Sequence, residues 1–248
     1  MERANYKNLQ VYYREGTADE SVLRDSFDND IFFSSIPYYK VKPNAVVIDV
    51  GAHIGTFALL LSNMAPAGKV FAIEPAQDTF DVLEKNVIAN KLKGKLIPVK
   101  AALFNANSNI KLFHDEQGGN WGHSIVSKLS SSFEEVETIT LDSFFERYQI
   151  QKCDLIKFNC EGAEFKIIQS VSDKILNSID TWIVLFHEDL ETEGSHMRIV
   201  NRFKQNGFKV NVLRMSDDQK RGWIMATKSF YDYYKYSIIN KLRNIFNL

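Results

Sequence analysis

The stretch Val46-Val47-Ile48-Asp49-Val50-Gly51-Ala52-His53-Ile54-Gly55-Thr56 decides the fold of this chain. Its first half is short, apolar and β-branched, which is typical of a strand buried on both faces. Gly51 allows a sharp turn, and a helical pattern begins at Thr56. A strand that runs through a glycine turn into a helix indicates a ligand-binding unit of a parallel α/β sheet.

Strand and helix patterns alternate on both sides of this stretch. We predict strands over residues 45–50, 69–73, 96–103, 154–160 and 182–186, and helices over 56–64, 78–90, 141–148, 163–171 and 195–206. The segments 208–213 and 223–227 are expected to close the sheet as an antiparallel pair. The alternation predicts a doubly wound, mostly parallel sheet.

Three segments depart from this alternation. Residues 1–43 carry no strong period and are interpreted as an N-terminal extension or lid on a domain formed by 44–228. Residues 105–140 insert two strands, 110–113 and 136–139, around a Gly/Ser-rich segment that we interpret as a second lid. Residues 229–248 form an amphipathic tail, which predicts contact with a membrane surface, with the domain itself or with a second subunit.

Composition narrows the class of protein. The 248 residues are 45% hydrophobic and carry a formal net charge of -1, which suits one domain and disfavours nucleic acid as the main partner. Cys153 and Cys160 match no zinc-ligand spacing and are expected to be reduced. We find no signal-peptide core and no apolar run of bilayer length, so we expect a cytoplasmic protein.

An acidic residue after the second strand supports a nucleoside ligand. Glu74 follows Gly51 by 23 positions, close to the offset of roughly 20 residues at which an acid binds ribose hydroxyls. A dinucleotide site prefers glycine where this chain has His53, because the diphosphate lies against bare backbone. The loop therefore favours S-adenosylmethionine over a nicotinamide or flavin dinucleotide. A turn that binds no ligand is the remaining alternative.

Further motifs follow the loop in a fixed order, at 72–75, 101–103, 120–124, 140–142 and 154–164. The last reads Asp-Leu-Ile-Lys-Phe-Asn-Cys-Glu-Gly-Ala-Glu. With the loop, they resemble the FkbM family of methyltransferases over about residues 45–228. The resemblance implies a Rossmann-like class I methyltransferase fold, with a seven-stranded sheet, an antiparallel last strand and an inserted hairpin. It also implies S-adenosyl-L-methionine as cofactor and O-methylation of hydroxyls on sugars, polyketides and similar acceptors.

Loop and resemblance together assign the cofactor contacts. They fall on Asp49, Gly51, Ala52, His53, Gly55, Thr56, Glu74, Pro75, Ala102 and Asn159. The family usually has an acid where this chain has Asn159, and an amide cannot hold a proton as a base. Asn159 therefore leaves two hypotheses open: an active enzyme, or a cofactor-binding protein whose catalysis is impaired.

Candidate catalytic groups follow the fourth and fifth predicted strands. Glu161, Glu164 and His187 would all lie at the carboxyl edge of the sheet, where open α/β folds bind ligands. His187 is the candidate base because an imidazole titrates near neutrality. The alternatives are that Glu164 only favours a helix N-terminus and that His187 is a hydrogen-bonded loop residue. A metal held by His187, Glu161 and Glu188 is not expected, since Asn159 removes a natural ligand.

The 105–140 insert holds candidate acceptor contacts. Trp121 is an aromatic that can stack on a sugar ring or on adenine, and His123 and Ser124 are adjacent to it. An ordinary mobile hairpin is the alternative. His114 and His196 lack special context and are expected at the surface. The sequence thus predicts an O-methyltransferase for a small hydroxylated acceptor such as a sugar or glycan intermediate, with a nicotinamide-dependent enzyme as the remaining alternative.

Overall fold

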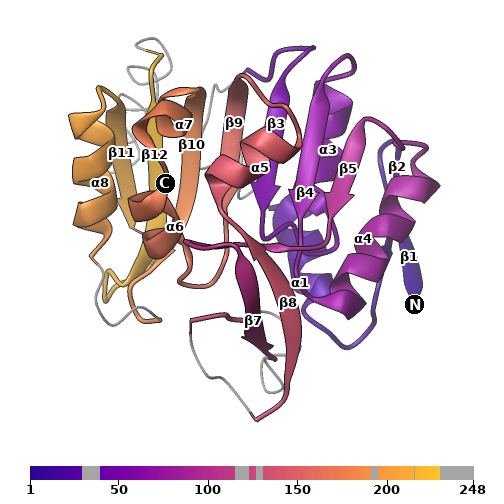
Figure 1. Ribbon diagram of the computed structural model, residues 1–248. Helices are drawn as coiled ribbons and strands as arrows, with labels where there is room; N and C mark the ends of the chain where they lie inside the picture. The colour runs from indigo at the N-terminus through magenta and orange to yellow at the C-terminus, as the bar shows by residue number, and fades with distance from the viewer. Residues whose placement is uncertain (30–39, 115–122, 127–130, 191–194, 215, 230–248) are drawn as a thin grey trace.

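The computed structural model describes residues 1–29, 40–114, 123–126, 131–190, 195–214 and 216–229 (Figure 1). Within them, seven strands form one sheet in the order β11-β12-β10-β9-β3-β4-β5. Their bounds are β3 Val46–Val50, β4 Lys69–Ile73, β5 Leu96–Val99, β9 Cys153–Phe158, β10 Ile179–His187, β11 Lys209–Arg214 and β12 Arg221–Thr227. β12 runs antiparallel to both of its neighbours, and the pairs among β5, β4, β3, β9 and β10 are parallel. The predicted fold class is confirmed.

Helices cover both faces of this sheet (Figure 1). The face that bears Ile48 and Phe71 packs against α5 (Leu141–Arg147), α6 (Glu164–Ser170), α7 (Asp173–Asn177) and α8 (His196–Gln205). The opposite face, with Val47 and Val70, packs against α3 (Thr56–Met64) and α4 (Gln77–Ala89). Successive side chains of a strand point to opposite faces, so each central strand supplies both apolar layers.

The N-terminal residues fold onto the α3/α4 side. β1 (Glu2–Tyr6) and β2 (Leu9–Tyr13) form an antiparallel hairpin, followed by α1 (Asp19–Leu23) and a π-helical turn, η1 (Arg24–Asp28). The side-chain amide of Asn86 on α4 bonds both the N–H and the C=O of Tyr12, and Asn90 does the same for Gln10. α4 thus satisfies the outer main-chain groups of β2 much as a neighbouring strand would.

The insert builds a small sheet of its own. β6 (Ala102–Leu103), β7 (Ser108–Phe113) and β8 (Phe133–Ile139) pair in the order β6-β8-β7, and Figure 1 shows β7 and β8 projecting away from the main sheet. The single strand predicted over 96–103 is therefore two strands, because the chain leaves the main sheet after Val99. Thr140 caps α5 by accepting a hydrogen bond from the Ser143 N–H, which gives the 140–142 motif a structural role.

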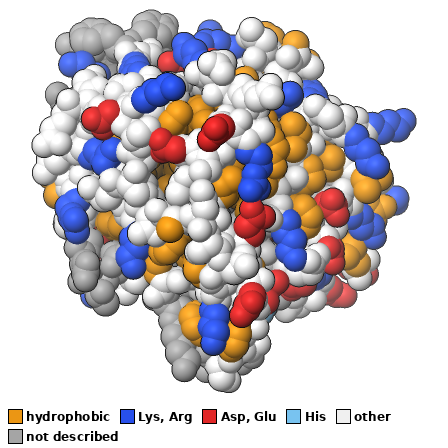
Figure 2. All heavy atoms as spheres, in the orientation of Figure 1, with side chains coloured by type: hydrophobic (Ala, Val, Ile, Leu, Met, Phe, Trp, Pro, Cys, Tyr) orange, Lys and Arg blue, Asp and Glu red, His pale blue; other side chains and the backbone are white. Residues whose placement is uncertain are grey.

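The surface in Figure 2 shows basic and acidic side chains intermixed, with apolar side chains visible between them. Among the described residues, no helix is long and apolar enough to cross a membrane. The predicted tail at 230–248 lies outside the described residues.

Candidate active site

The cofactor loop turns where its glycines predict. Gly51 has a φ of +70°, and a Cβ there would lie 1.8 Å from the backbone oxygen of Asn159. The N–H groups of Gly51 and Ala52 both donate to the Ile73 carbonyl, which fixes the turn against β4. Gly55 has a φ of +89° and packs against Leu83, so that α3 can begin close to α4. Gly51 excludes a side chain for steric reasons, and the left-handed backbone at both positions favours glycine.

A cavity of about 430 Å³ opens where β3, β4, β9 and β10 end. The structure brings most predicted site residues to its wall: Gly51, Ala52, His53, Thr56, Glu74, Pro75, Ala102, His123, Asn159, Glu161 and His187. Four others lie behind the wall and hold it in place: Asp49, Gly55, Ser124 and Glu164. Trp121 lies outside the described residues.

Glu74 lies at the end of β4 and lines the cavity. Its carboxylate is only 7% exposed, and its oxygens accept hydrogen bonds from the His53 N–H at 2.9 Å and the Ala76 N–H at 3.0 Å. Burial outweighs these bonds and raises the pKa of Glu74 to about 7. Each carboxylate oxygen keeps a second lone pair for a donor in the cavity.

Lys157 is a site residue that the sequence reasoning did not single out. It pairs in register with Asp49 across β3 and β9, and its Nζ lies 2.9 Å from Asp49 Oδ1. The same ammonium donates to the Gly51 carbonyl at 3.0 Å. This buried ion pair therefore fixes the backbone of the glycine turn from beneath. A lysine between the apolar residues Ile156 and Phe158, with Asp49 near the end of another buried strand, was the available signal.

His187 sits between two acids at the end of β10. Its Nδ1 lies 3.0 Å from Glu164 Oε1, and its backbone N–H donates to the same oxygen at 2.8 Å. Glu164 is fully buried, which fixes the ring from behind, while Nε2 lies 3.6 Å from Glu161 Oε1. Burial opposes the imidazolium, but the charges of Glu164 and Glu161 outweigh it and raise the pKa of His187.

Asn159 contributes a polar atom with unused capacity. Its Oδ1 is buried and accepts no hydrogen bond from any part of the chain that the structure describes. Buried acceptors normally have a partner, and Asn159 lines the cavity, so a donor on a bound ligand would satisfy it.

Comparison with known proteins identifies the domain around this cavity. A family model described as the methyltransferase FkbM domain matches residues 49–210. The chain belongs to the FkbM family of methyltransferases. Its cofactor is therefore S-adenosyl-L-methionine, as the loop predicted.

Two relatives are also similar in sequence to this chain. "Hexuronic acid methyltransferase AglP" of Haloferax volcanii is 30% identical over 152 residues, which are 61% of this chain and 60% of AglP. "31-O-demethyl-FK506 methyltransferase FkbM" of Streptomyces tacrolimicus is 24% identical over 233 residues, covering 83% of this chain and 84% of that protein. Among solved structures, the N-terminal domain of human METTL16 aligns with a TM-score of 0.51 at 13% identity, over 88% of this chain and 75% of that chain. This last likeness concerns the fold alone.

The FkbM cavity fits this cofactor. Glu74 offers carboxylate oxygens to ribose hydroxyls, and the open Oδ1 of Asn159 suits the ammonium group of the methionine moiety. Gly51 and Ala52 bring backbone to the cavity wall without a bulky side chain.

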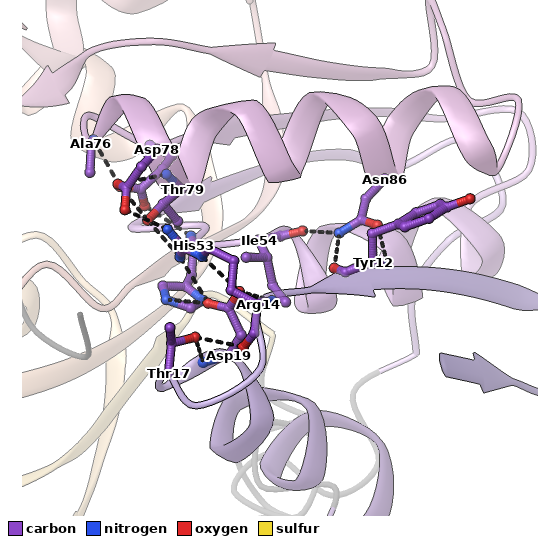
Figure 3. A network of polar contacts seen from close by, with 11 residues as sticks. Tyr12, Arg14, Thr17, Asp19, His53, Ile54, Ala76, Asp78, Thr79 and Asn86 are labelled. Atoms are coloured by element: carbon purple, nitrogen blue, oxygen red, sulfur yellow. Dashed lines mark hydrogen bonds and ion pairs between the residues drawn. The ribbon is translucent and has the colours of Figure 1, made fainter. Parts of the chain in front are cut away.

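Residues before the FkbM match also reach the cavity. Val22, Asp25 and Ser26 line it, and the Ser26 hydroxyl donates to Thr56 Oγ1 at 2.7 Å. Asp19 approaches the loop residue His53, with 3.5 Å between Oδ1 and Nε2 (Figure 3). The N-terminal extension is thus part of the cavity wall, which no local sequence pattern signalled.

The expectation that His196 lies at the surface is wrong. Its side chain is 4% exposed, stacks on Phe186 and has Nδ1 2.6 Å from Glu188 Oε1. Glu188 also accepts the His196 N–H at the start of α8, so it serves that helix terminus. His114 is half-buried, with its ring against that of His123. The described residues contain no His, Cys, Asp and Glu group arranged to hold a metal ion.

Proposed function

We propose that this FkbM domain is an O-methyltransferase that acts on a hydroxyl of a small acceptor, of the sugar or glycan-intermediate type. The observation that carries the proposal is the His187 ring. Buried Glu164 fixes it from one side, and the other side belongs to the wall of the cofactor cavity. A histidine base that is oriented by a carboxylate is an arrangement that activates hydroxyl nucleophiles.

The protein's groups have separable tasks. When bound, S-adenosylmethionine supplies an activated methyl group, so the chain has to position the acceptor and remove its proton. Glu164 accepts the Nδ1–H of His187, which leaves the Nε2 lone pair to take the proton of the acceptor hydroxyl. Glu161, 3.6 Å from Nε2, stabilises the imidazolium that results.

The cavity mouth offers groups that recognise a polyhydroxylated acceptor. Arg221 on β12 is the register partner of His187 on β10, and both line the cavity. Asp189 fixes the Arg221 guanidinium through Oδ2, 2.7 Å from Nη2. Ser216 lines the same wall. The relatives AglP and FkbM are named for a hexuronic acid and for a 31-O-demethyl acceptor, which supports a hydroxylated substrate for this chain.

Turnover with a panel of acceptors tests the proposal. Purified chain is incubated with S-adenosylmethionine and with neutral hexosides, uronic acid glycosides or nucleotide sugars, and release of S-adenosylhomocysteine is measured. His187→Gln should lower kcat by about 10²-fold or more, because general base catalysis contributes that much, and should leave the Kd for S-adenosylhomocysteine unchanged. Turnover equal to wild type would remove His187 from the mechanism.

A cofactor-binding protein without catalysis is the second candidate, favoured by the amide at Asn159. It predicts that wild-type chain binds S-adenosylhomocysteine, consumes no S-adenosylmethionine with any acceptor, and gains turnover on Asn159→Asp. Turnover by wild type, with loss on Asn159→Asp, would support the active enzyme instead.

A further inference from the structure

The N-terminal segment, residues 2–28, precedes the FkbM family match, yet it touches the cofactor loop itself. Docking of β2 depends on the amides of Asn86 and Asn90 and on the buried side chains of Leu9 and Val11. Those contacts hold the hairpin on α4. They leave unexplained why the acid Asp19 is buried farther along the segment, bonded to Arg14 and close to the loop residue His53.

Asp19 is the buried centre of a polar cluster (Figure 3). It is 0% exposed and accepts three hydrogen bonds from Arg14, at 2.8 Å from the backbone N–H, 3.0 Å from Nε and 2.9 Å from Nη2. Arg14 also bonds Asp78 and Thr79 at the start of α4. Burial disfavours the carboxylate, but Arg14 and the charge of His53 outweigh it and lower the pKa of Asp19.

His53 contacts Asp19 from the side of the cavity. It has a φ of +53°, a left-handed conformation that is uncommon outside glycine and in which Asn, Asp and His are the enriched side chains. Its N–H donates to Glu74 Oε2, and its Nε2 lies 3.5 Å from Asp19 Oδ1. His53 thus contacts two acids: its backbone N–H donates to Glu74, and its ring lies within ion-pair distance of Asp19.

We propose that Asp19 is a positioning residue of the cofactor site, which acts through His53 so that the N-terminal segment sets the affinity for S-adenosylmethionine. The inference rests on the cofactor site of the proposed function and is independent of the acceptor. It assigns the segment a specific task, to hold the loop residue that donates to Glu74.

The affinity for S-adenosylhomocysteine, measured by titration calorimetry, tests this. Asp19→Asn should weaken binding about 10-fold, the effect of one charge-assisted contact, while kcat at saturating S-adenosylmethionine stays at the wild-type value. Arg24→Ala is the matched control, because Arg24 directly follows α1, is exposed, and has a side chain that bonds only Ser21 among the described residues. It should bind as wild type does.

A double-mutant cycle separates positioning from general support. His53→Asn keeps a residue that tolerates the left-handed conformation and keeps the N–H to Glu74, but removes the ring. If Asp19 acts through that ring, Asp19→Asn costs little further affinity in the His53→Asn background. Additive losses would overturn the inference, as would an unchanged Kd for Asp19→Asn.

A second variant covers the case in which Asp19→Asn fails to fold. Arg14→Lys keeps the charge beside Asp19 but loses the planar fork, and it should also raise the Kd without lowering kcat. An unchanged Kd for Arg14→Lys would then overturn the inference. No binding by the wild-type chain would overturn the proposed function as well, whereas binding by wild type and equal binding by the variants would overturn the positioning role alone.

Discussion

Replacing Glu74 with Gln tests the burial of the acid that we propose binds the ribose, without any knowledge of the acceptor. The pKa of this carboxyl rises from 4.5 to about 7 in the folded chain, chiefly because burial disfavours its charge. Glutamine has nearly the same shape but does not titrate. The free energies of unfolding of the two proteins should therefore depend differently on pH.

The difference has a definite direction and size. Below pH 4.5, Glu74 is protonated in both the folded and the unfolded state, so its burial removes no charge and does not lower the free energy of unfolding. As the pH rises, the unfolded chain releases the proton first, and the folded chain follows near pH 7. At about 1.4 kcal/mol per pKa unit, this shift removes about 3 kcal/mol of wild-type stability between pH 4.5 and about pH 7. Glutamine does not titrate, so Glu74→Gln does not lose this stability. Its free energy of unfolding relative to wild type should therefore rise by about 3 kcal/mol between pH 4.5 and about pH 7.

Glu74→Gln also has an effect on stability that does not depend on pH. The carboxylate accepts from both the His53 and Ala76 N–H groups, and an amide has only one oxygen, so one donor loses its partner at a cost of about 1–3 kcal/mol at every pH. Urea denaturation at a series of pH values separates the constant offset from the pH-dependent part. A flat difference between pH 5 and pH 8 would refute the burial of an ionisable Glu74. In the same samples, Glu74→Gln should lose most of the thermal shift that S-adenosylhomocysteine gives wild type.

Two further predictions concern the loop and the base. Gly51→Ala should destabilise the chain by about 2 kcal/mol or more and abolish S-adenosylhomocysteine binding, because its Cβ would lie 1.8 Å from the Asn159 oxygen; denaturation and calorimetry measure both, and normal binding would contradict the turn geometry. The acidic limb of kcat/KM should lie above pH 6.5, since Glu164 and Glu161 raise the pKa of His187, whose neutral form is the base. Glu164→Gln should move that limb to lower pH, and an unmoved limb in the pH–rate profile would exclude His187 as the titrating group.

The central sheet could be predicted because its signals are local. Residues 56–64 form a helix with the predicted bounds, since apolar spacing begins after Gly55 and is broken at Pro66 and Gly68. Residues 69–73 likewise form the predicted strand. α7, at Asp173–Asn177, was not predicted because five residues cannot show a helical period. The hairpin of β1 and β2 was not predicted because its partner, α4, is remote in sequence.

The sequence could predict those site residues whose position follows from the end of a strand. Glu74, Gly51 and His187 are at the cavity because each ends or directly follows a parallel strand, and such strand ends share one edge. Which acid fixes His187 depends on side-chain directions, so Glu164 and Glu161 could not be assigned separate tasks beforehand. The link from Asp19 to His53 joins segments outside and inside the cofactor motif, and only tertiary packing shows it.

The side-chain amides of Asn86 and Asn90 hydrogen-bond the main chain of β2 at Gln10 and Tyr12. These bonds do not involve the side chains of Gln10 and Tyr12. Substitutions along the outer edge of β2 should therefore be tolerated, except for proline, as long as α4 keeps its two asparagines. Hairpins that keep apolar side chains at the positions of Leu9 and Val11 could be exchanged on this helix as a module. Descendants of one ancestral domain could vary the segment that follows, and with it the wall around the ligand, without rebuilding the sheet.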